Sequence, residues 1–362
     1  MTDGITMRAD GKSEMAYTGD TPWHDKGNRL TPGAPIEEWL TAAGMDWRIQ
    51  RAIVRYAIAR DSTPESYRAM NDRHVLLRSD TKDALGIVSD GYQIVQPAAV
   101  LEFFRDLVAA AGFTLETAGT LFGGKRFWAL AAIGESAAIA DPADKMKRYL
   151  MLSTSCDGSM ATEGRYVDIR TVCNNTLEAN RRTAAKVRVT HRSEFQEATV
   201  KRDLGVDTAH GQFEETMAAM RRLADTRLLA RDTVIQTAEL FTPGASRLAR
   251  EELKKILDSK PVVRVSELAL DGKAMGAGLD GVRGTQWGWL NAVTQYVDHE
   301  SRARSQDNRL NSAWFGKGAD LKERAYEMAL ASVDGTPVTL TTLRANQGLP
   351  QVSLLDEVIA SS

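Results

Sequence analysis

The feature that most constrains the fold is a change of hydrophobic period near residue 193. Between residues 47 and 172 the chain breaks into short runs of alternating apolar and polar residues, separated by Gly, Asp, Asn and Pro turn signals. After residue 193 apolar residues recur every three or four positions, as on amphipathic helices. Strands joined by short turns pair antiparallel, whereas parallel strands need a long crossover between them. We therefore expect an α+β fold: an antiparallel β-meander with packed helices, followed by a mainly helical C-terminal part.

The chain of 362 residues divides into four parts on this pattern. Residues 1–30 are polar and rich in Gly, Asp and Thr, which predicts an irregular N-terminal arm. Residues 31–192 are expected to form the α+β sheet domain. Residues 193–331 are expected to form a helical region with a Gly-rich linker at 271–288. Residues 332–362 are poor in charge and predict a weakly ordered tail.

The expected elements follow from periodicity and from turn and cap residues. Strands are expected at residues 47–58, 66–70, 74–78, 84–88, 113–122, 125–133, 146–154, 164–172 and 186–190, with turns at Asn71–Asp72 and Gly123–Gly124. Helices are expected at residues 35–44, 97–111, 175–185, 213–228, 233–241, 246–257, 286–300 and 319–331.

The sequence has no features of a membrane-spanning protein, a secreted protein or a disulfide-rich protein. No apolar run approaches the ~18–20 residues that span a bilayer, and residues 1–12 lack the apolar core of a signal peptide. The only cysteines, Cys156 and Cys173, are too few for a disulfide framework or a four-cysteine zinc site. We therefore expect a cytoplasmic protein without membrane contact.

Charge is balanced overall but uneven along the chain. The net charge is −2, from 46 basic and 48 acidic residues, so nucleic-acid binding would need a local patch. Residues 145–192 hold ten basic residues against four acidic ones, and residues 302–324 hold six against three. Tyr149, Tyr166 and Trp314 lie within these segments. Basic groups with nearby aromatic rings suit a single-strand groove, although solvated charged faces would give the same pattern.

Motifs for enzymatic chemistry are weak. Residues 276–281 match G-x-G-x-x-G but follow a helical segment instead of a strand, so they are interpreted as a flexible linker. Cys156, Cys173 and His191 match no zinc spacing. Asp298 and His299 are neighbours on a helix and do not face each other. We therefore predict no catalytic residue, no metal site and no cofactor.

The most distinctive stretch is a basic strand that runs into a turn. The strand carries Arg165, Tyr166 and Arg170, and the turn lies at Asn174–Asn175, before the helix expected at 175–185. Backbone N–H groups at that helix N-terminus, with Arg170 nearby, would form a phosphate site. The alternative is a capped strand-to-helix corner in which the asparagines satisfy the helix end.

Four segments resemble the phage/plasmid-like protein family, also called domain of unknown function 932. They are Thr21-Pro22-Trp23-His24 with Gly27, the Asp157-Gly158-Ser159 turn, residues 170–177, and residues 285–299 with the run Asn291-Ala292-Val293-Thr294-Gln295-Tyr296-Val297-Asp298-His299. They occur in order over most of the chain from about 20 to 330. Members lie mainly on phage and plasmid genomes, so the family name identifies a genetic context and not a reaction.

The chain is also remotely similar to Rad52-like single-strand annealing proteins. Those are α+β modules that assemble into rings, bind the DNA backbone in a basic groove and need no nucleotide cofactor. The resemblance implies a non-enzymatic mobile-element protein that binds single-stranded DNA and promotes strand annealing as a homo-oligomer, with a ring as one form. The DNA-binding residues expected from the charge pattern are Arg165, Tyr166, Arg170, Arg181, Arg182, Lys186, Arg188 and Arg192.

Two other functions stay open on the sequence. The first is a structural or interaction protein of phage replication or defence without direct DNA contact, which the overall acidity favours. The second is a metal-dependent nuclease that would use an acidic cluster such as Asp80, Asp83 and Asp90.

Overall fold

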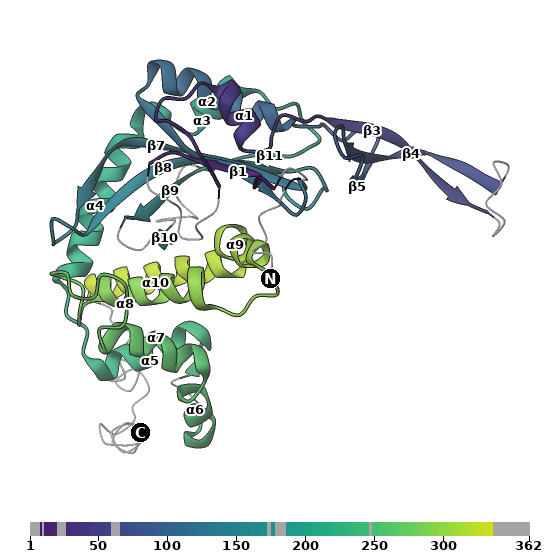
Figure 1. The fold of residues 1–362 in the computed structure, drawn as a ribbon. Coiled ribbons are helices and arrows are strands. Elements are labelled where there is room, and N and C mark those ends of the chain that lie inside the picture. Colours follow the sequence, from purple (N-terminus) through teal and green to yellow (C-terminus); the bar gives the residue numbers. More distant parts are fainter. Residues whose placement is uncertain are drawn as a thin grey trace.

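A computed structural model provides the structure of the chain. It describes residues 8, 11–19, 27–58, 66–171, 175–177, 186–245 and 248–335. The architecture is α+β, as the change of hydrophobic period predicts: an antiparallel sheet lies between a layer of helices on one face and a larger helical region on the other (Figure 1).

The main sheet has eight strands in the order β10-β9-β8-β7-β6-β1-β2, and β11 also pairs with β9. Its strands are β1 (Met15–Tyr17), β2 (Asn28–Arg29), β6 (Phe113–Leu121), β7 (Arg126–Ala138), β8 (Lys145–Ser155), β9 (Thr162–Arg170), β10 (Asn175–Leu177) and β11 (Lys186–Val189). All neighbours are antiparallel except β1 and β2. The predicted meander is therefore confirmed.

Two local predictions in this sheet are wrong. The N-terminal arm was expected to be irregular, but Met15, Ala16 and Tyr17 are buried and pair with β6, because strand β6 leaves its outer edge free for them. A helix was expected from Asn175, but residues 175–177 form strand β10 and pair with the end of β9. No helix therefore begins at Asn175, where the phosphate site was predicted, and residues 172–174 and 178–185 lie outside the described part of the chain.

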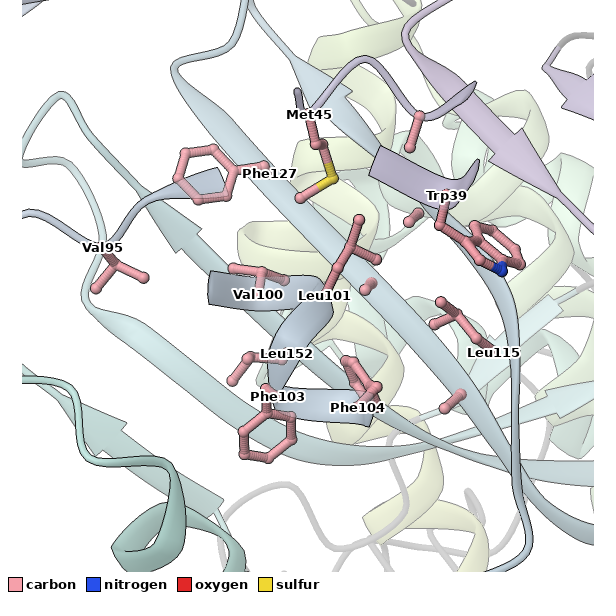
Figure 2. Packing of buried hydrophobic residues seen from close by; sticks show 14 of the residues in the cluster. Trp39, Met45, Val95, Val100, Leu101, Phe103, Phe104, Leu115, Phe127 and Leu152 are labelled. Atoms are coloured by element: carbon pink, nitrogen blue, oxygen red, sulfur yellow. The ribbon is translucent and has the colours of Figure 1, made fainter. Parts of the chain in front are cut away.

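One face of the sheet is covered by α1 (Ile36–Ala42), α2 (Pro97–Ala110) and α3 (Glu197–Asp203) (Figure 1). Helix α2 has Pro in its first turn, where the missing N–H costs nothing. It stops before Gly112, whose φ of +69° suits a helix end. Figure 2 shows the core beneath it, in which Phe103, Phe104 and Trp39 pack against the sheet.

The other face of the sheet packs on the helical region. Its helices are α4 (Ala209–Asp225), α5 (Ala230–Phe241), α6 (Arg250–Leu257), α7 (Lys260–Leu270), α8 (Gln286–Gln295), the π-helix η4 (Tyr296–Glu300), α9 (Gln306–Phe315) and α10 (Lys317–Val333), with a 3-10 turn η2 (Val206–Thr208) before α4. Leu130, Met151 and Val167 of the sheet meet Trp314 and Phe315 of α9. All ten residues of α8 are buried, so this helix is the centre of the region.

Most of the helical prediction is confirmed, with two omissions. The expected helices at 213–228, 233–241, 286–300 and 319–331 correspond to α4, α5, α8 with η4, and α10. Helix α6 begins at Arg250 instead of 246, and α7 and α9 were not predicted. Residues 271–284 connect α7 to α8 through successive turns, as expected for the Gly-rich linker. The tail beyond residue 335 lies outside the described part.

A second, three-stranded antiparallel sheet projects from the body (Figure 1). It consists of β3 (Ile49–Ala57), β4 (Tyr67–Arg78) and β5 (Ala84–Ser89), and we call it the ribbon. The turn predicted at Asn71–Asp72 is wrong. Strand β4 continues through these residues. Ile53 of β3 pairs with His74 and the next residue, Val54, pairs with Met70, so residues 71–73 of β4 form a bulge instead of a turn.

Among the described residues, no helix is both long and apolar enough to cross a membrane.

Candidate nucleic-acid interface

Three buried arginines on β8 and β9 join the sheet to the helical region. Arg170 is 1% exposed, and its Nε and Nη2 donate to the Asp144 carboxylate at 2.6 and 2.8 Å. Its Nη1 donates to the Met275 carbonyl at 2.9 Å, and Trp287 Nε1 donates to Asp144 at 2.9 Å. A buried charge is tolerated only when it is paired and hydrogen-bonded. Arg170 is therefore part of the junction between the sheet and the linker before α8.

Arg165 and Tyr166 are also engaged inside the fold. Arg165 Nη2 donates to the Trp314 carbonyl at 2.6 Å, and its guanidinium lies 4.9 Å from the Phe315 ring centroid. The Tyr166 hydroxyl donates to the Leu204 carbonyl at 3.2 Å. A phosphate contact needs an accessible guanidinium and base stacking needs an exposed ring. Arg165, Tyr166 and Arg170 are buried, so the structure corrects their expected DNA-binding role to a structural one.

Arg148 shows how this junction is built from strand register. Arg148 of β8 lies directly opposite Asp168 of β9, and its Nε and Nη2 donate to that carboxylate at 2.8 and 2.9 Å. Nη2 also donates to Thr216 Oγ1 of α4 at 2.9 Å. Burial raises the pKa of Asp168, and the Arg148 guanidinium opposes that rise. Much of the positive charge in residues 145–192 is thus neutralised internally.

The other five predicted residues divide between exposed positions and positions outside the described part. The Arg188 side chain is 64% exposed on β11, an outer strand of the sheet, with Glu163 at 3.7 Å. Arg192 is exposed just beyond this strand. Arg181 and Arg182 lie outside the described residues, and only the backbone of Lys186 is described, as the first residue of β11.

Arg192 lies beside the root of the ribbon. Its neighbour His191 accepts a backbone hydrogen bond from Gln93 at 2.6 Å, and the His191 ring stacks on Tyr92 with 4.5 Å between centroids. The Tyr92 carbonyl in turn accepts a hydrogen bond from Arg51 of β3. Burial lowers the pKa of His191, so its ring is neutral near pH 7. The exposed end of β11 therefore lies close to strand β3 of the ribbon, on the side that carries Arg51.

The ribbon has two different faces because side chains alternate along each strand. On one face, Arg51 opposes Leu76 and Ile53 opposes His74, and further out lie Arg55 and Tyr67. We call this the basic face. Arg55 is exposed and Tyr67 is 38% exposed. The sequence analysis missed this face, although large side chains at both alternating sets of positions in residues 49–58 indicate a strand with neither face fully buried.

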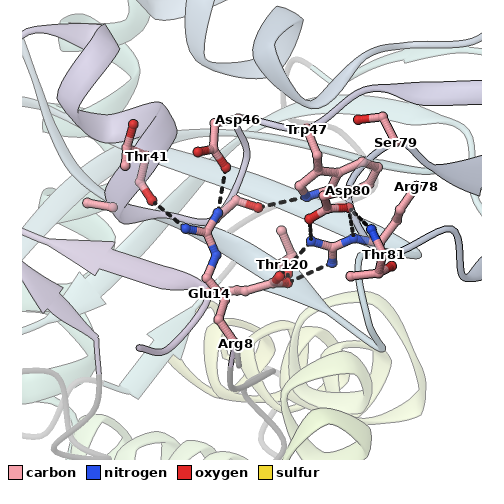
Figure 3. A network of polar contacts seen from close by, with 12 residues as sticks. Arg8, Glu14, Thr41, Asp46, Trp47, Arg78, Ser79, Asp80, Thr81 and Thr120 are labelled. Atoms are coloured by element: carbon pink, nitrogen blue, oxygen red, sulfur yellow. Dashed lines mark hydrogen bonds and ion pairs between the residues drawn. The ribbon is translucent and has the colours of Figure 1, made fainter. Parts of the chain in front are cut away.

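A buried polar network fixes the root of the ribbon to the body (Figure 3). Arg78, the last residue of β4, donates from Nη2 to Glu14 at 2.7 Å and to Asp80 at 2.8 Å. Its guanidinium lies 4.3 Å from the Trp47 ring centroid. Hydrogen bonds from Arg78 lower the pKa of Asp80. The Asp80 carboxylate therefore stays charged near neutral pH, and the ribbon leaves the body from a fixed root.

The structure gives little support to metal or dinucleotide chemistry. In the described part of the chain, no three His, Cys, Asp or Glu side chains gather as a metal site, so Asp80, Asp83 and Asp90 do not form the cluster a nuclease would need. The glycines at 276–281 follow helix α7 instead of a strand, and their loop packs on the sheet through Met275.

Comparison with known proteins defines the family. The chain matches the model of the family described as a domain of unknown function, DUF932, over residues 84–314. Because this match covers more than half of the chain, the protein belongs to that family. Comparisons with curated proteins and with solved structures each found no match.

Proposed function

We propose that this protein binds single-stranded DNA and promotes the annealing of complementary strands in the metabolism of phage or plasmid DNA, in the cytoplasm and without a nucleotide cofactor. The observation that carries the proposal is the basic face of the ribbon, where Arg55 and Tyr67 lie exposed on a scaffold that continues to Arg192 and Arg188. Exposed arginines contact phosphates and exposed aromatic rings stack on bases, which is how sequence-independent single-strand sites work.

The dimensions of the surface suit a flexible strand. Strand β3 has nine residues, and at ~3.3 Å per residue it is about 30 Å long. Such a length accommodates several nucleotides, within the range of about 4–16 known for single-strand modules. The surface is an open, narrow ribbon instead of a closed channel, so bases stacked on it would stay accessible to a complementary strand.

The first test compares arginine variants in DNA binding. Arg55→Ala/Arg192→Ala should bind a ~30-nucleotide single strand more weakly, and the slope of log affinity against log salt should become shallower by roughly 1.4, since each lost phosphate contact contributes about 0.7. The charge-matched control is Arg202→Ala/Arg222→Ala, at exposed positions of α3 and α4. Equal slopes for wild type and Arg55→Ala/Arg192→Ala would remove these residues from the site.

The second test concerns stacking and annealing. Tyr67→Ala should lose about 1–3 kcal/mol of single-strand affinity whereas Tyr67→Phe keeps it, because the ring and not the hydroxyl stacks. Annealing of two labelled complementary strands should be accelerated in EDTA without ATP. Strand cleavage that appears with Mg²⁺ or Mn²⁺ would favour the nuclease alternative, and absence of both binding and annealing would favour an interaction protein.

A further inference from the structure

The face of the ribbon opposite the basic face is apolar and exposed. Val54 of β3 pairs with Met70 of β4, and Val75 of β4 pairs with Ile87 of β5, so these four side chains lie on one face. Tyr56 lies two residues from Val54 on the same face. Among the described residues, eleven large apolar side chains are exposed, and four of them, Tyr56, Ile58, Met70 and Ile87, lie on this face. Such concentration of exposed apolar surface marks an interaction site.

We propose that a second copy of this chain covers this apolar face, with the two ribbons packed antiparallel about a twofold axis. Strands β3, β4 and β5 have nine, twelve and six residues, and at ~3.3 Å per residue and ~4.8 Å between strands they present a face of roughly 400 Å². Two such faces, with their bordering side chains, would bury on the order of 1,000 Å², close to the lower limit for a specific interface. A copy of the same ribbon is the partner that matches this narrow face in length, width and apolar character.

Charge complementarity along the ribbon selects the antiparallel arrangement. In the outer part of the apolar face, Arg68 of β4 lies opposite Tyr56 of β3, whereas Arg55 belongs to the basic face. At the root, Asp80 is paired with Arg78, and Asp83 lies in the turn between β4 and β5. Antiparallel packing sets Arg68 of each copy over the Asp83 end of the other. Parallel packing would set like charges together, which is unfavourable.

A twofold axis near the middle of β4 also gives a consistent register. It would lay Met70 of one copy near Val75 of the other. The same axis brings Arg68 to the level of Leu77 in the second copy, and Leu77 pairs with Ala84, the neighbour of Asp83. The basic faces of both ribbons then point outward. This inference does not require DNA binding, and it assigns a defined surface to the homo-oligomer expected from the sequence.

The test is sedimentation velocity on the full chain without DNA, from about 1 to 100 µM. Wild type should sediment as a dimer, and Met70→Glu/Ile87→Glu as a monomer with unchanged circular dichroism and melting temperature, because both side chains are exposed. The matched control is Leu229→Glu/Val263→Glu, which changes exposed apolar residues before α5 and on α7 and should stay dimeric. A monomeric wild type at 100 µM, or a dimer unaffected by Met70→Glu/Ile87→Glu, would overturn the proposal.

The orientation is tested by charge exchange. Arg68→Glu and Asp83→Lys should each weaken the dimer at least tenfold at low salt, because each sets like charges against each other at both ends. Their equimolar mixture should restore a heterodimer, since both contacts regain opposite charges. A mixture no tighter than either variant alone would rule out the antiparallel arrangement. If the wild-type protein is monomeric in the absence of DNA and Met70→Glu/Ile87→Glu no longer binds DNA, the dimer proposal is wrong and the apolar face is a DNA-binding surface instead.

Discussion

Replacing Arg170 by Ala should destabilise the protein without changing the DNA affinity of the molecules that remain folded. The guanidinium makes two hydrogen bonds to Asp144 and one to the Met275 carbonyl, and it is 1% exposed. Removing one partner of a buried ion pair leaves an uncompensated charge and costs about 3–5 kcal/mol. At ~2–4 °C per kcal/mol, the melting temperature should fall by roughly 6–20 °C.

The assay is thermal and urea unfolding followed by circular dichroism, with Arg202→Ala as the control for an exposed arginine. Arg170→Met/Asp144→Leu should recover part of the loss, because two apolar side chains leave no unpaired charge. Anisotropy with a single strand, measured well below the melting temperature, should match wild type. A loss of stability below about 1 kcal/mol, together with weaker DNA binding, would refute this account and return Arg170 to the DNA-binding site.

Three further predictions concern other parts of the fold. The free energy of unfolding should fall as pH drops from about 7 to 5. Burial lowers the pKa of His191 in the folded protein, whereas the unfolded chain takes up the proton near the ordinary pKa of ~6.5. Urea unfolding midpoints measured against pH should fall less in His191→Gln than in wild type. Gly124→Ala should cost about 1–3 kcal/mol, because φ is +90° and the new Cβ would lie 2.6 Å from the Trp47 ring. Gly123→Ala, with φ +70° but open space around it, should cost less in the same urea titration. Glu14→Gln should cost about 1–3 kcal/mol by weakening the bond to Arg78, and should raise amide hydrogen exchange at the root of the ribbon.

The sequence predicted those elements whose pattern is local. The β6–β7 hairpin follows from two strand-like runs around Gly123–Gly124, which adopt the positive φ that glycine tolerates. Helix α2 follows from Pro at its first turn, an apolar face and Gly112. The ribbon was divided wrongly at Asn71–Asp72 because the residues that keep β4 continuous are on β3, which no local signal identifies.

The candidate site could be predicted less well than the fold. Arg148 and Arg170 look like free charges in the sequence, since Asp168 and Asp144 are 20 and 26 residues away. Only the register of β8 with β9 sets Arg148 opposite Asp168 and brings Arg170 beside Met146, two residues from Asp144. The exposed arginines of the ribbon lay in a segment whose alternation was recognised. Its large side chains at both sets of alternating positions indicate that neither face is fully buried, but how far each side chain is exposed depends on layers that other parts of the chain supply.

The most direct test of the central claim is fluorescence anisotropy of a labelled ~30-nucleotide single strand, titrated with the wild-type protein at a series of salt concentrations. Contacts from Arg55, Arg188 and Arg192 predict binding at low salt, with log affinity falling against log salt at a slope of at least about −2. Absence of binding at low salt by folded protein, or binding indifferent to salt, would contradict the account.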